Sequence, residues 1–154
     1  MRIRLLFIGK AGEGPAAAIV EDYLRRVRRT CPVEVVEIRP ATGKALRGAD
    51  RARREGRAAL DALGPRDLLV ALDAGGRAWT SEEFARWLDR SLQSAPAVAF
   101  LVGGAEGLPP EARSRANTVL SLSPLTLPHE LARAVLAEQI YRAFSILRGT
   151  PYHR

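Results

Sequence analysis

The chain has 154 residues, of which 47% are hydrophobic and 27% are charged, with a formal net charge of +7. This balance excludes a disordered chain, and the length suits one α/β domain, 1–154, whose core needs no disulfide. The single cysteine, Cys31, indicates a reducing compartment, and we expect it to be a packed thiol. No apolar stretch approaches the ~20 residues of a membrane span and no signal peptide is seen, so we expect a cytoplasmic protein.

Strand-like and helix-like segments alternate along the chain. The first predicted strand covers residues 3–8, and after a glycine-rich turn a helix begins at Pro15, a residue favoured at the first helical position. Further strands are predicted over residues 33–38, 67–73, 97–102 and 118–123, with a tight turn at 73–76. Further helices are predicted over residues 49–63, 84–93, 109–115 and 130–148. This alternation predicts an α/β fold in which a parallel sheet carries helices on both faces.

Arginine residues gather in clusters, which bears on the kind of partner. One cluster is Arg25, Arg26, Arg28 and Arg29, another is Arg47, Arg51, Arg53, Arg54 and Arg57, and further arginines lie at the C-terminus. Arginine is preferred over lysine where phosphate binding or base stacking matters, so the clusters favour a polyanion such as nucleic acid. An arginine-rich genome is the alternative explanation. We expect the helix over 49–63 to contribute salt-dependent binding with little base specificity.

The first turn, residues 9–14, lies between a strand and a helix and looks like a phosphate-binding loop. Its glycines, Gly9, Gly12 and Gly14, fit neither the GxGxxG nor the GxxxxGK[ST] spacing. Glu13 would also repel a phosphate at this position. We therefore interpret the segment as a plain turn, with a small-molecule site there as the weaker alternative.

Three loops follow strand ends, where ligands bind in parallel sheets. Leu72 and Asp73 precede a Gly-Gly pair at 75–76, Gly103 and Gly104 precede Gly107, and residues 122–128 form an apolar loop. Glycines let backbone amides approach a ligand, and an apolar loop suits an adenine and a ribose held by backbone groups and apolar walls. The alternative is a loop that is only buried under the last helix.

Patterns typical of metal sites and of nucleophilic catalysis are missing. Two histidines and one cysteine lie far apart without ligand spacing, so no metal is expected, and no Ser-His-Asp order stands out. His129 starts the last helix and either caps it or has a functional role. Glu138 and Arg142 are four residues apart, so they share a helix face and form at least an ion pair. The ending Tyr152-His153-Arg154 is unusual, because a terminal tail is normally expendable.

Motifs in the second half of the chain resemble one family closely. They are Gly103-Gly104-Ala105-Glu106-Gly107-Leu108, the segment SLSPLTLPHELARAVLAEQIYRA, and the terminal Pro151-Tyr152-His153-Arg154. Together they resemble the ribosomal RNA large subunit methyltransferase H family of the SPOUT methyltransferases. The resemblance covers nearly the whole chain, since the opening strand, the EDYLRRV helix and Leu72-Asp73 agree as well.

The resemblance implies methyl transfer from S-adenosylmethionine to N3 of a pseudouridine, in a stem-loop of large-subunit ribosomal RNA within an assembled ribosome. It also implies a SPOUT fold with a C-terminal trefoil knot, and a homodimer. The cofactor would be held by Leu72, Gly103, Gly104, Leu122, Ser123, Pro124, Leu125, Thr126 and Leu127. The target base would face Glu138, Arg142, Tyr152, His153 and Arg154.

The implied chemistry gives the tail residues distinct roles. N3 of pseudouridine carries a proton and is a poor nucleophile, so catalysis calls for proton removal, positioning or anion stabilisation. His153 titrates near neutrality and is the best candidate for the general base, while Tyr152 would stack on the base. Arg142 and Arg154 would hold RNA phosphate or base oxygens. The tail serves either its own subunit or its neighbour, and the alternative function is a non-catalytic RNA-binding or ribosome-associated protein of the same fold.

Overall fold

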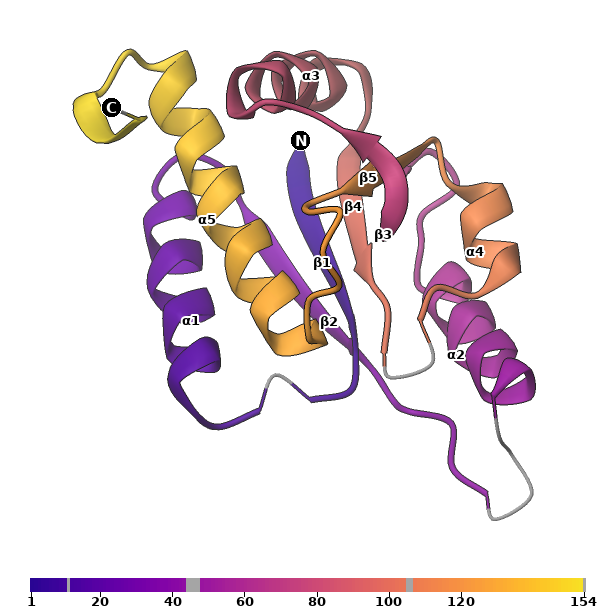
Figure 1. Ribbon diagram of the computed structural model, residues 1–154. Coiled ribbons are helices and arrows are strands. Elements are labelled where there is room, and N and C mark those ends of the chain that lie inside the picture. Colours follow the sequence, from indigo (N-terminus) through magenta and orange to yellow (C-terminus); the bar gives the residue numbers. More distant parts are fainter. Residues whose placement is uncertain (11, 44–47, 105–106, 154) are drawn as a thin grey trace.

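Strands and helices alternate along the chain, as the sequence predicts (Figure 1). The computed structural model describes residues 1–10, 12–43, 48–104 and 107–153, the side chain of His153 excepted. The strands are β1 (Arg2–Ile8), β2 (Val33–Ile38), β3 (Leu68–Ala78), β4 (Ala97–Val102) and β5 (Thr118–Ser121). The helices are α1 (Pro15–Val27), α2 (Ala49–Asp61), α3 (Ser81–Ser94), α4 (Pro110–Arg115) and α5 (His129–Leu147), followed by the 3-10 turn η1 (Pro151–His153).

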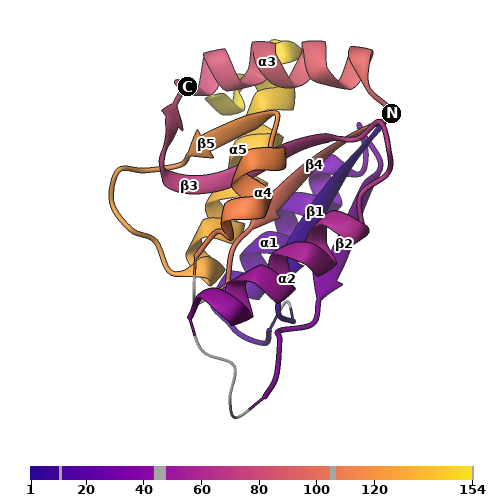
Figure 2. The same cartoon turned by 90° about the vertical axis from the view of Figure 1, so that its right-hand side faces the viewer.

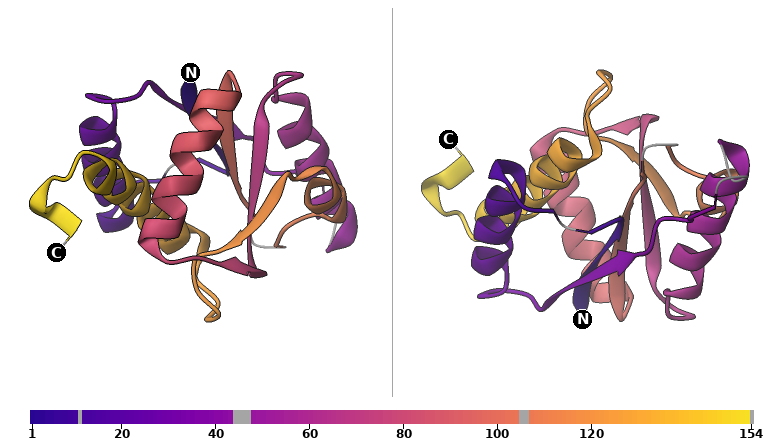
Figure 3. Two further views of the ribbon diagram at one scale, coloured as in Figure 1. Left: turned by 90° about the horizontal axis from the view of Figure 1, so that it is seen from above. Right: turned by 90° about the horizontal axis from the view of Figure 1, so that it is seen from below.

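The five strands form one parallel sheet in the order β2-β1-β4-β3-β5. Helices α1, α3 and α5 cover one face, and α2 and α4 cover the other, which the views along the sheet make plain (Figures 2 and 3). The predicted α/β class, with a parallel sheet between helices, is therefore confirmed. The trefoil knot stays a prediction. In the described part of the chain, no helix is both long and apolar enough to cross a membrane.

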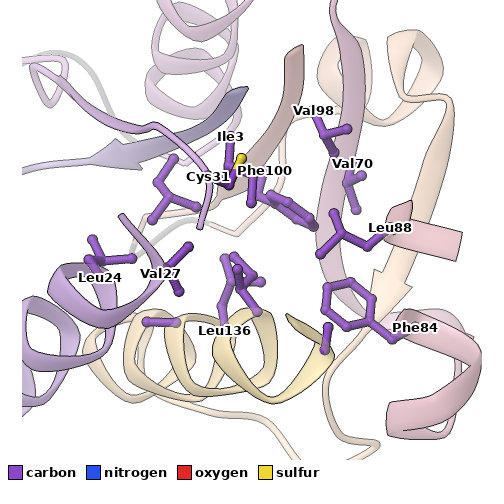
Figure 4. Packing of buried hydrophobic residues seen from close by; sticks show 14 of the residues in the cluster. Ile3, Leu24, Val27, Cys31, Val70, Phe84, Leu88, Val98, Phe100 and Leu136 are labelled. Carbon is purple, nitrogen blue, oxygen red and sulfur yellow. The ribbon is translucent and has the colours of Figure 1, made fainter. Parts of the chain in front are cut away.

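Each face of the sheet has its own hydrophobic core. Successive strand residues point to opposite faces, so Leu5 and Phe7 of β1 enter the core under α1, α3 and α5, whereas Leu6 enters the core under α2 and α4. Figure 4 shows Phe100 of β4 in the larger core, where Cys31 is also packed. This explains the nearly continuous apolar runs of the central strands, which are covered on both sides.

The end of β3 differs from the prediction. A tight turn was expected at 73–76, but the strand continues to Ala78 and pairs again with β5 after a register shift between Leu72 and Arg77. A Cβ on Gly76 would lie 2.7 Å from the carbonyl oxygen of Val119. The prediction of a turn was wrong because Gly76 permits a close approach of two strands, a role that the local sequence does not distinguish from turning.

A buried arginine joins the end of β1 to the start of α5. Arg133 is 2% exposed and donates hydrogen bonds to the carbonyl oxygens of Ile8 (2.6 Å) and Lys10 (2.8 Å). Its guanidinium lies over the ring of Phe7, 4.7 Å from the ring centroid. Burial lowers the pKa of Arg133, while Glu130 and Glu37 oppose that shift. The contacts fix the first turns of α5 against the sheet edge where β1 ends.

Candidate functional site

A cavity of about 280 Å³ lies between the middle of β3, the loop after β4, and the β5–α5 loop with the start of α5. Leu72, Val102, Leu108, Leu122 and Leu127 supply apolar walls. The position agrees with the general rule that ligands of parallel sheets bind beyond the carboxyl ends of the strands. Because a volume of this size and apolar walls with polar groups between them suit an organic molecule, this cavity is the candidate binding site.

The loop after β4 forms the floor of the cavity through close backbone packing. A Cβ on Gly103 would lie 2.9 Å from the carbonyl oxygen of Gly107, so the two backbones leave no space for a side chain there. The amide of Gly107 donates a 3.1 Å hydrogen bond to the carbonyl oxygen of Gly104, which closes the loop. Ala105 and Glu106, in the middle of the same motif, lie outside the described residues.

The loop between β5 and α5 forms the opposite wall and is ordered by its own serines. The Ser121 hydroxyl donates to the carbonyl oxygen of Ser123 (3.0 Å), and the Ser123 hydroxyl accepts from the amide of Leu125 (3.0 Å). These are the local turns that serine favours. Leu125, which also lines the cavity, is 74% exposed.

The cavity gathers most of the residues that the resemblance assigns to the cofactor. The lining includes Leu72, Gly103, Gly104, Leu122, Ser123, Leu125, Thr126 and Leu127. Pro124 is exposed and does not line it. Their role in holding a cofactor stays a prediction. The lining also includes residues that were not assigned in advance, namely Asp73, Ala74, Val102, Gly107, Leu108, His129 and Ala132.

Some of these additional residues carried a signal in the sequence. Asp73 and Gly107 belong to the strand-end loops already singled out, and Asp73 is held by an ion pair with Arg113 at 3.1 Å. The sequence leaves open whether His129 caps the last helix or has a functional role. Pro128 is the N-cap of α5 and no side chain caps that helix, so His129 does not act as its cap. In the described residues, no group of three His, Cys, Asp or Glu side chains gathers as metal ligands would.

A second cluster forms where the chain end folds back on α5. The Tyr152 hydroxyl donates a hydrogen bond to Glu138 Oε1 (3.0 Å) and lies 2.9 Å from the Tyr23 hydroxyl of α1. Arg142 binds the same Glu138 oxygen through Nε (2.9 Å) and Nη2 (2.6 Å), and its guanidinium lies 5.0 Å from the centroid of the Tyr152 ring. Three of the five residues predicted to face a base are thus in direct contact.

The electrostatics of this cluster keep Tyr152 neutral and Arg142 charged. Burial raises the pKa of Tyr152, and hydrogen bonds with Tyr23 and Glu138 raise it further. The hydrogen bond with Glu138 raises the pKa of Arg142. Tyr152 therefore acts as a neutral hydrogen-bond donor, and Arg142 as a permanent cation. Arg154 and the side chain of His153, the other two predicted residues, lie outside what the structure describes.

The cavity and the chain-end cluster are separated along α5. Ala132 lines the cavity, and Arg142 lies ten residues further on, which corresponds to about 15 Å of helix. In Figure 1 the start of α5 and the chain end lie at opposite ends of that helix. Within one chain, Arg142 and Tyr152 therefore do not line the cavity. The resemblance assigned both sets of residues to one reaction, so this separation is the main finding that a function must explain.

The whole chain is similar to proteins of one kind. The family described as "Predicted SPOUT methyltransferase" matches residues 1–153. The chain is 46% identical over 155 residues to the ribosomal RNA large subunit methyltransferase H of Gemmatimonas aurantiaca, with all of both chains covered. The protein of the same name from Alkalilimnicola ehrlichii is 46% identical over 157 residues, with 100% of this chain and 99% of the relative covered. That from Acidiphilium cryptum is 47% identical over 153 residues, with 99% and 94% covered.

Proposed function

Since the chain belongs to the SPOUT methyltransferases, in the ribosomal RNA large subunit methyltransferase H family, we propose that it methylates large-subunit ribosomal RNA with S-adenosylmethionine as the methyl donor. The proposed target is N3 of a pseudouridine in a stem-loop of an assembled ribosome, which would place the protein in the cytoplasm. The observation that carries the proposal is the cavity at the strand ends, because eight of the nine residues assigned to the cofactor line it.

The cavity fits the methyl donor chemically. The adenine and ribose need apolar walls and backbone hydrogen-bonding groups, and Leu72, Leu122 and Leu127 supply such walls. The absence of a side chain at Gly103 lets the Gly107 backbone pack against it, which shapes the loop that lines the cavity. The first amides of α5 have no side-chain cap and begin at the cavity, where they would favour the carboxylate of the donor. When bound, S-adenosylmethionine supplies an electrophilic methyl group on its sulfonium sulfur.

The protein's task in this reaction is to present a nucleophile without its proton. N3 of the base must lose its proton as it forms the bond to the methyl carbon, so a proton acceptor is needed near it. We assign that role to His153. Tyr152, which burial keeps neutral, would contact the base with its ring, while its hydroxyl proton is donated to Glu138. Arg142, held by Glu138, would stabilise negative charge that develops on the base oxygens.

Ala132 and Arg142 are about 15 Å apart along α5, and a homodimer explains how both could serve one site. Arg142 lies on the same helix as Ala132, and Tyr152 of η1 is hydrogen-bonded to Glu138 of that helix, so a chain cannot bring its own Arg142 and Tyr152 to its own cavity. A second copy can, if its chain end lies against the cavity of the first, and twofold symmetry then gives two equivalent sites. We therefore propose that each site takes its cofactor loops from one subunit and Glu138, Arg142, Tyr152, His153 and Arg154 from its partner.

Two measurements test the proposal. Isothermal titration with S-adenosylmethionine should show binding, and ribosomes from a strain that lacks the gene should gain one methyl group on large-subunit rRNA when incubated with protein and cofactor. Mass spectrometry of rRNA fragments locates the modified nucleoside. Cofactor binding without methylation of any rRNA would contradict the proposed substrate. Ribosome binding without cofactor binding would instead favour the alternative, a non-catalytic ribosome-associated protein.

A further inference from the structure

A second cavity, of about 490 Å³, lies between α1 and the C-terminal end of α5. Its lining includes four arginines, one tyrosine and one aspartate: Arg25, Arg26, Arg29, Arg148, Tyr141 and Asp22. It is separate from the cofactor cavity, with which it shares no residue. The sequence showed three of these arginines as one cluster, but it did not show that Arg148, more than a hundred residues away, completes the same cavity.

The charges in this cavity are only partly balanced. Asp22 forms ion pairs with Arg25 and with Arg26, the second at 2.6 Å. Arg29 and Arg148 are exposed and, in the described part of the chain, have no ion-pair partner. Two guanidinium groups therefore face solvent without a carboxylate, beside two others that share one. Such a site attracts anions strongly, and an aspartate that holds Arg25 and Arg26 in place lowers the entropy lost when an anion binds.

The neighbourhood identifies the class of anion. The guanidinium of Arg26 lies over the Tyr141 ring, 5.6 Å from the ring centroid. Tyr141 also contacts Tyr152 edge-to-face, with 4.7 Å between the two ring centroids. One aromatic ring thus separates the arginine cavity from the tyrosine that we assign to the target base. A phosphodiester next to that base would come within reach of planar guanidinium forks, which match phosphate geometry.

The other arginine cluster is less suited to this task. On α2, Arg53 pairs with Glu111 of α4 at 3.3 Å and Arg57 pairs with Asp61 at 3.2 Å. Figure 2 shows α2 and α4 on the face of the sheet opposite to α1 and α5. The helix over 49–63, which we expected to contribute ribosome binding, is therefore far from the chain-end cluster.

From these contacts we infer that the cavity between α1 and α5 binds a backbone phosphate of the substrate RNA, adjacent to the nucleotide that enters the active site. The inference rests on the proposed function, and it adds where the RNA strand runs. Arg29 and Arg148 would make the main phosphate contacts, while Arg26 would orient the Tyr141 ring. The RNA strand would then pass from this cavity across Tyr141 to Tyr152 and on to the partner subunit's cofactor loops.

The test compares two double variants that each remove two exposed arginines. Arg29→Gln/Arg148→Gln empties the cavity of its unpaired cations, and Arg86→Gln/Arg90→Gln removes the same charge from the exposed side of α3, to which no binding role is assigned. The probe is ribosomes from a strain that lacks the gene, and their affinity for the protein is measured from low to moderate salt. The first variant should bind at least about tenfold more weakly, and the slope of log Kd against log salt should fall by one to two. The second variant should bind ribosomes with a Kd within about twofold of the wild-type value.

The outcomes separate this inference from the proposed function. An unchanged salt slope in Arg29→Gln/Arg148→Gln, or an equal loss in both double variants, would overturn the phosphate site, even if wild-type protein methylates rRNA. Failure of the wild-type protein to bind S-adenosylmethionine would overturn the proposed function, while a loss of ribosome binding confined to Arg29→Gln/Arg148→Gln would still support the RNA site. Cofactor affinity should be the same in all three proteins, because neither pair of arginines lines that cavity.

Discussion

The Tyr152 hydroxyl donates a 3.0 Å hydrogen bond to Glu138 Oε1, which anchors the end of the chain to the helix that precedes it. Tyr152 has one hydroxyl proton, so in the 2.9 Å contact with the Tyr23 hydroxyl the donor is Tyr23. The two bonds hold the tail between α1 and α5, away from the cofactor cavity of its own chain. A tail built into the fold in this way is poorly explained as an expendable terminus.

Removal of the Tyr152 hydroxyl should affect both stability and activity. In Tyr152→Phe, Glu138 loses one hydrogen bond and Tyr23 loses its acceptor, so we expect a loss of about 1–2 kcal/mol in the free energy of unfolding. Methylation should fall while the affinity for S-adenosylmethionine stays constant. Urea denaturation and titration calorimetry measure the two effects. Tyr23→Phe is the control, because it removes one bond of the same pair without touching Glu138; equal losses of activity in the two variants would argue against a role for Tyr152 at the base.

The raised pKa of Tyr152 predicts how stability depends on pH. A tyrosine whose pKa is higher in the folded than in the unfolded protein stabilises the fold fully below the unfolded value, about 10, and this stabilisation is lost as the pH rises towards the folded value. The urea midpoint of the wild type should therefore decrease more steeply between pH 9.5 and 11 than that of Tyr152→Phe. Parallel decreases would show that Tyr152 does not titrate differently in the two states.

The strands and the cofactor loops were predictable from local sequence. β2 and β4 have the predicted bounds: β4 is buried throughout and shows a continuous apolar run, and in the edge strand β2 the apolar residues are interrupted only by the exposed Glu34 and Glu37. Three loops at the ends of parallel strands must meet at one edge, so the residues of the cavity were also predictable. The length of α5 contained a further signal, since ten residues of helix between Ala132 and Arg142 already require that the chain end lies away from that cavity.

Contacts between distant segments were not predictable in the same way. Tyr23 and Tyr152 are 129 residues apart, and no local pattern pairs them. Gly76 carries the same sequence signal as a turn glycine, although it serves the close approach of β3 and β5. The knot and the homodimer came from the family resemblance, because composition and periodicity alone would give an ordinary sheet with helices on both faces.

A side chain at Gly103 should distort the loop that lines the cofactor cavity. In Gly103→Ala the new Cβ would lie 2.9 Å from the carbonyl oxygen of Gly107, which forces one of the two backbones to move. We expect S-adenosylmethionine to bind at least about tenfold more weakly, while ribosome affinity changes little because that surface is elsewhere. Titration calorimetry measures the affinity for S-adenosylmethionine, and sedimentation with ribosomes measures the affinity for ribosomes. Undiminished cofactor affinity in a folded variant would remove the loop after β4 from the site.

Arg133 should be among the residues that stability depends on most. In Arg133→Met the carbonyl oxygens of Ile8 and Lys10 lose charged donors while the volume over Phe7 is largely kept. The expected loss is about 2–4 kcal/mol, measured by urea denaturation. Arg86→Met is the matched control, since Arg86 is an exposed arginine of α3, and it should change stability by no more than about 0.5 kcal/mol. Similar losses in the two variants would show that the buried contacts contribute little.

The most direct test of a site shared between two subunits is complementation. One chain carries Gly103→Val, whose side chain clashes with the Gly107 backbone and distorts the loop that lines the cofactor cavity, and the other lacks residues 151–154. Neither protein alone should methylate ribosomes, although the shortened chain should still bind S-adenosylmethionine. If the two are unfolded together and refolded at equal concentration, half of the dimers are mixed and each has one complete site, so about a quarter of wild-type activity should return. A mixture no more active than either variant alone would show that the tail does not complete the partner's site.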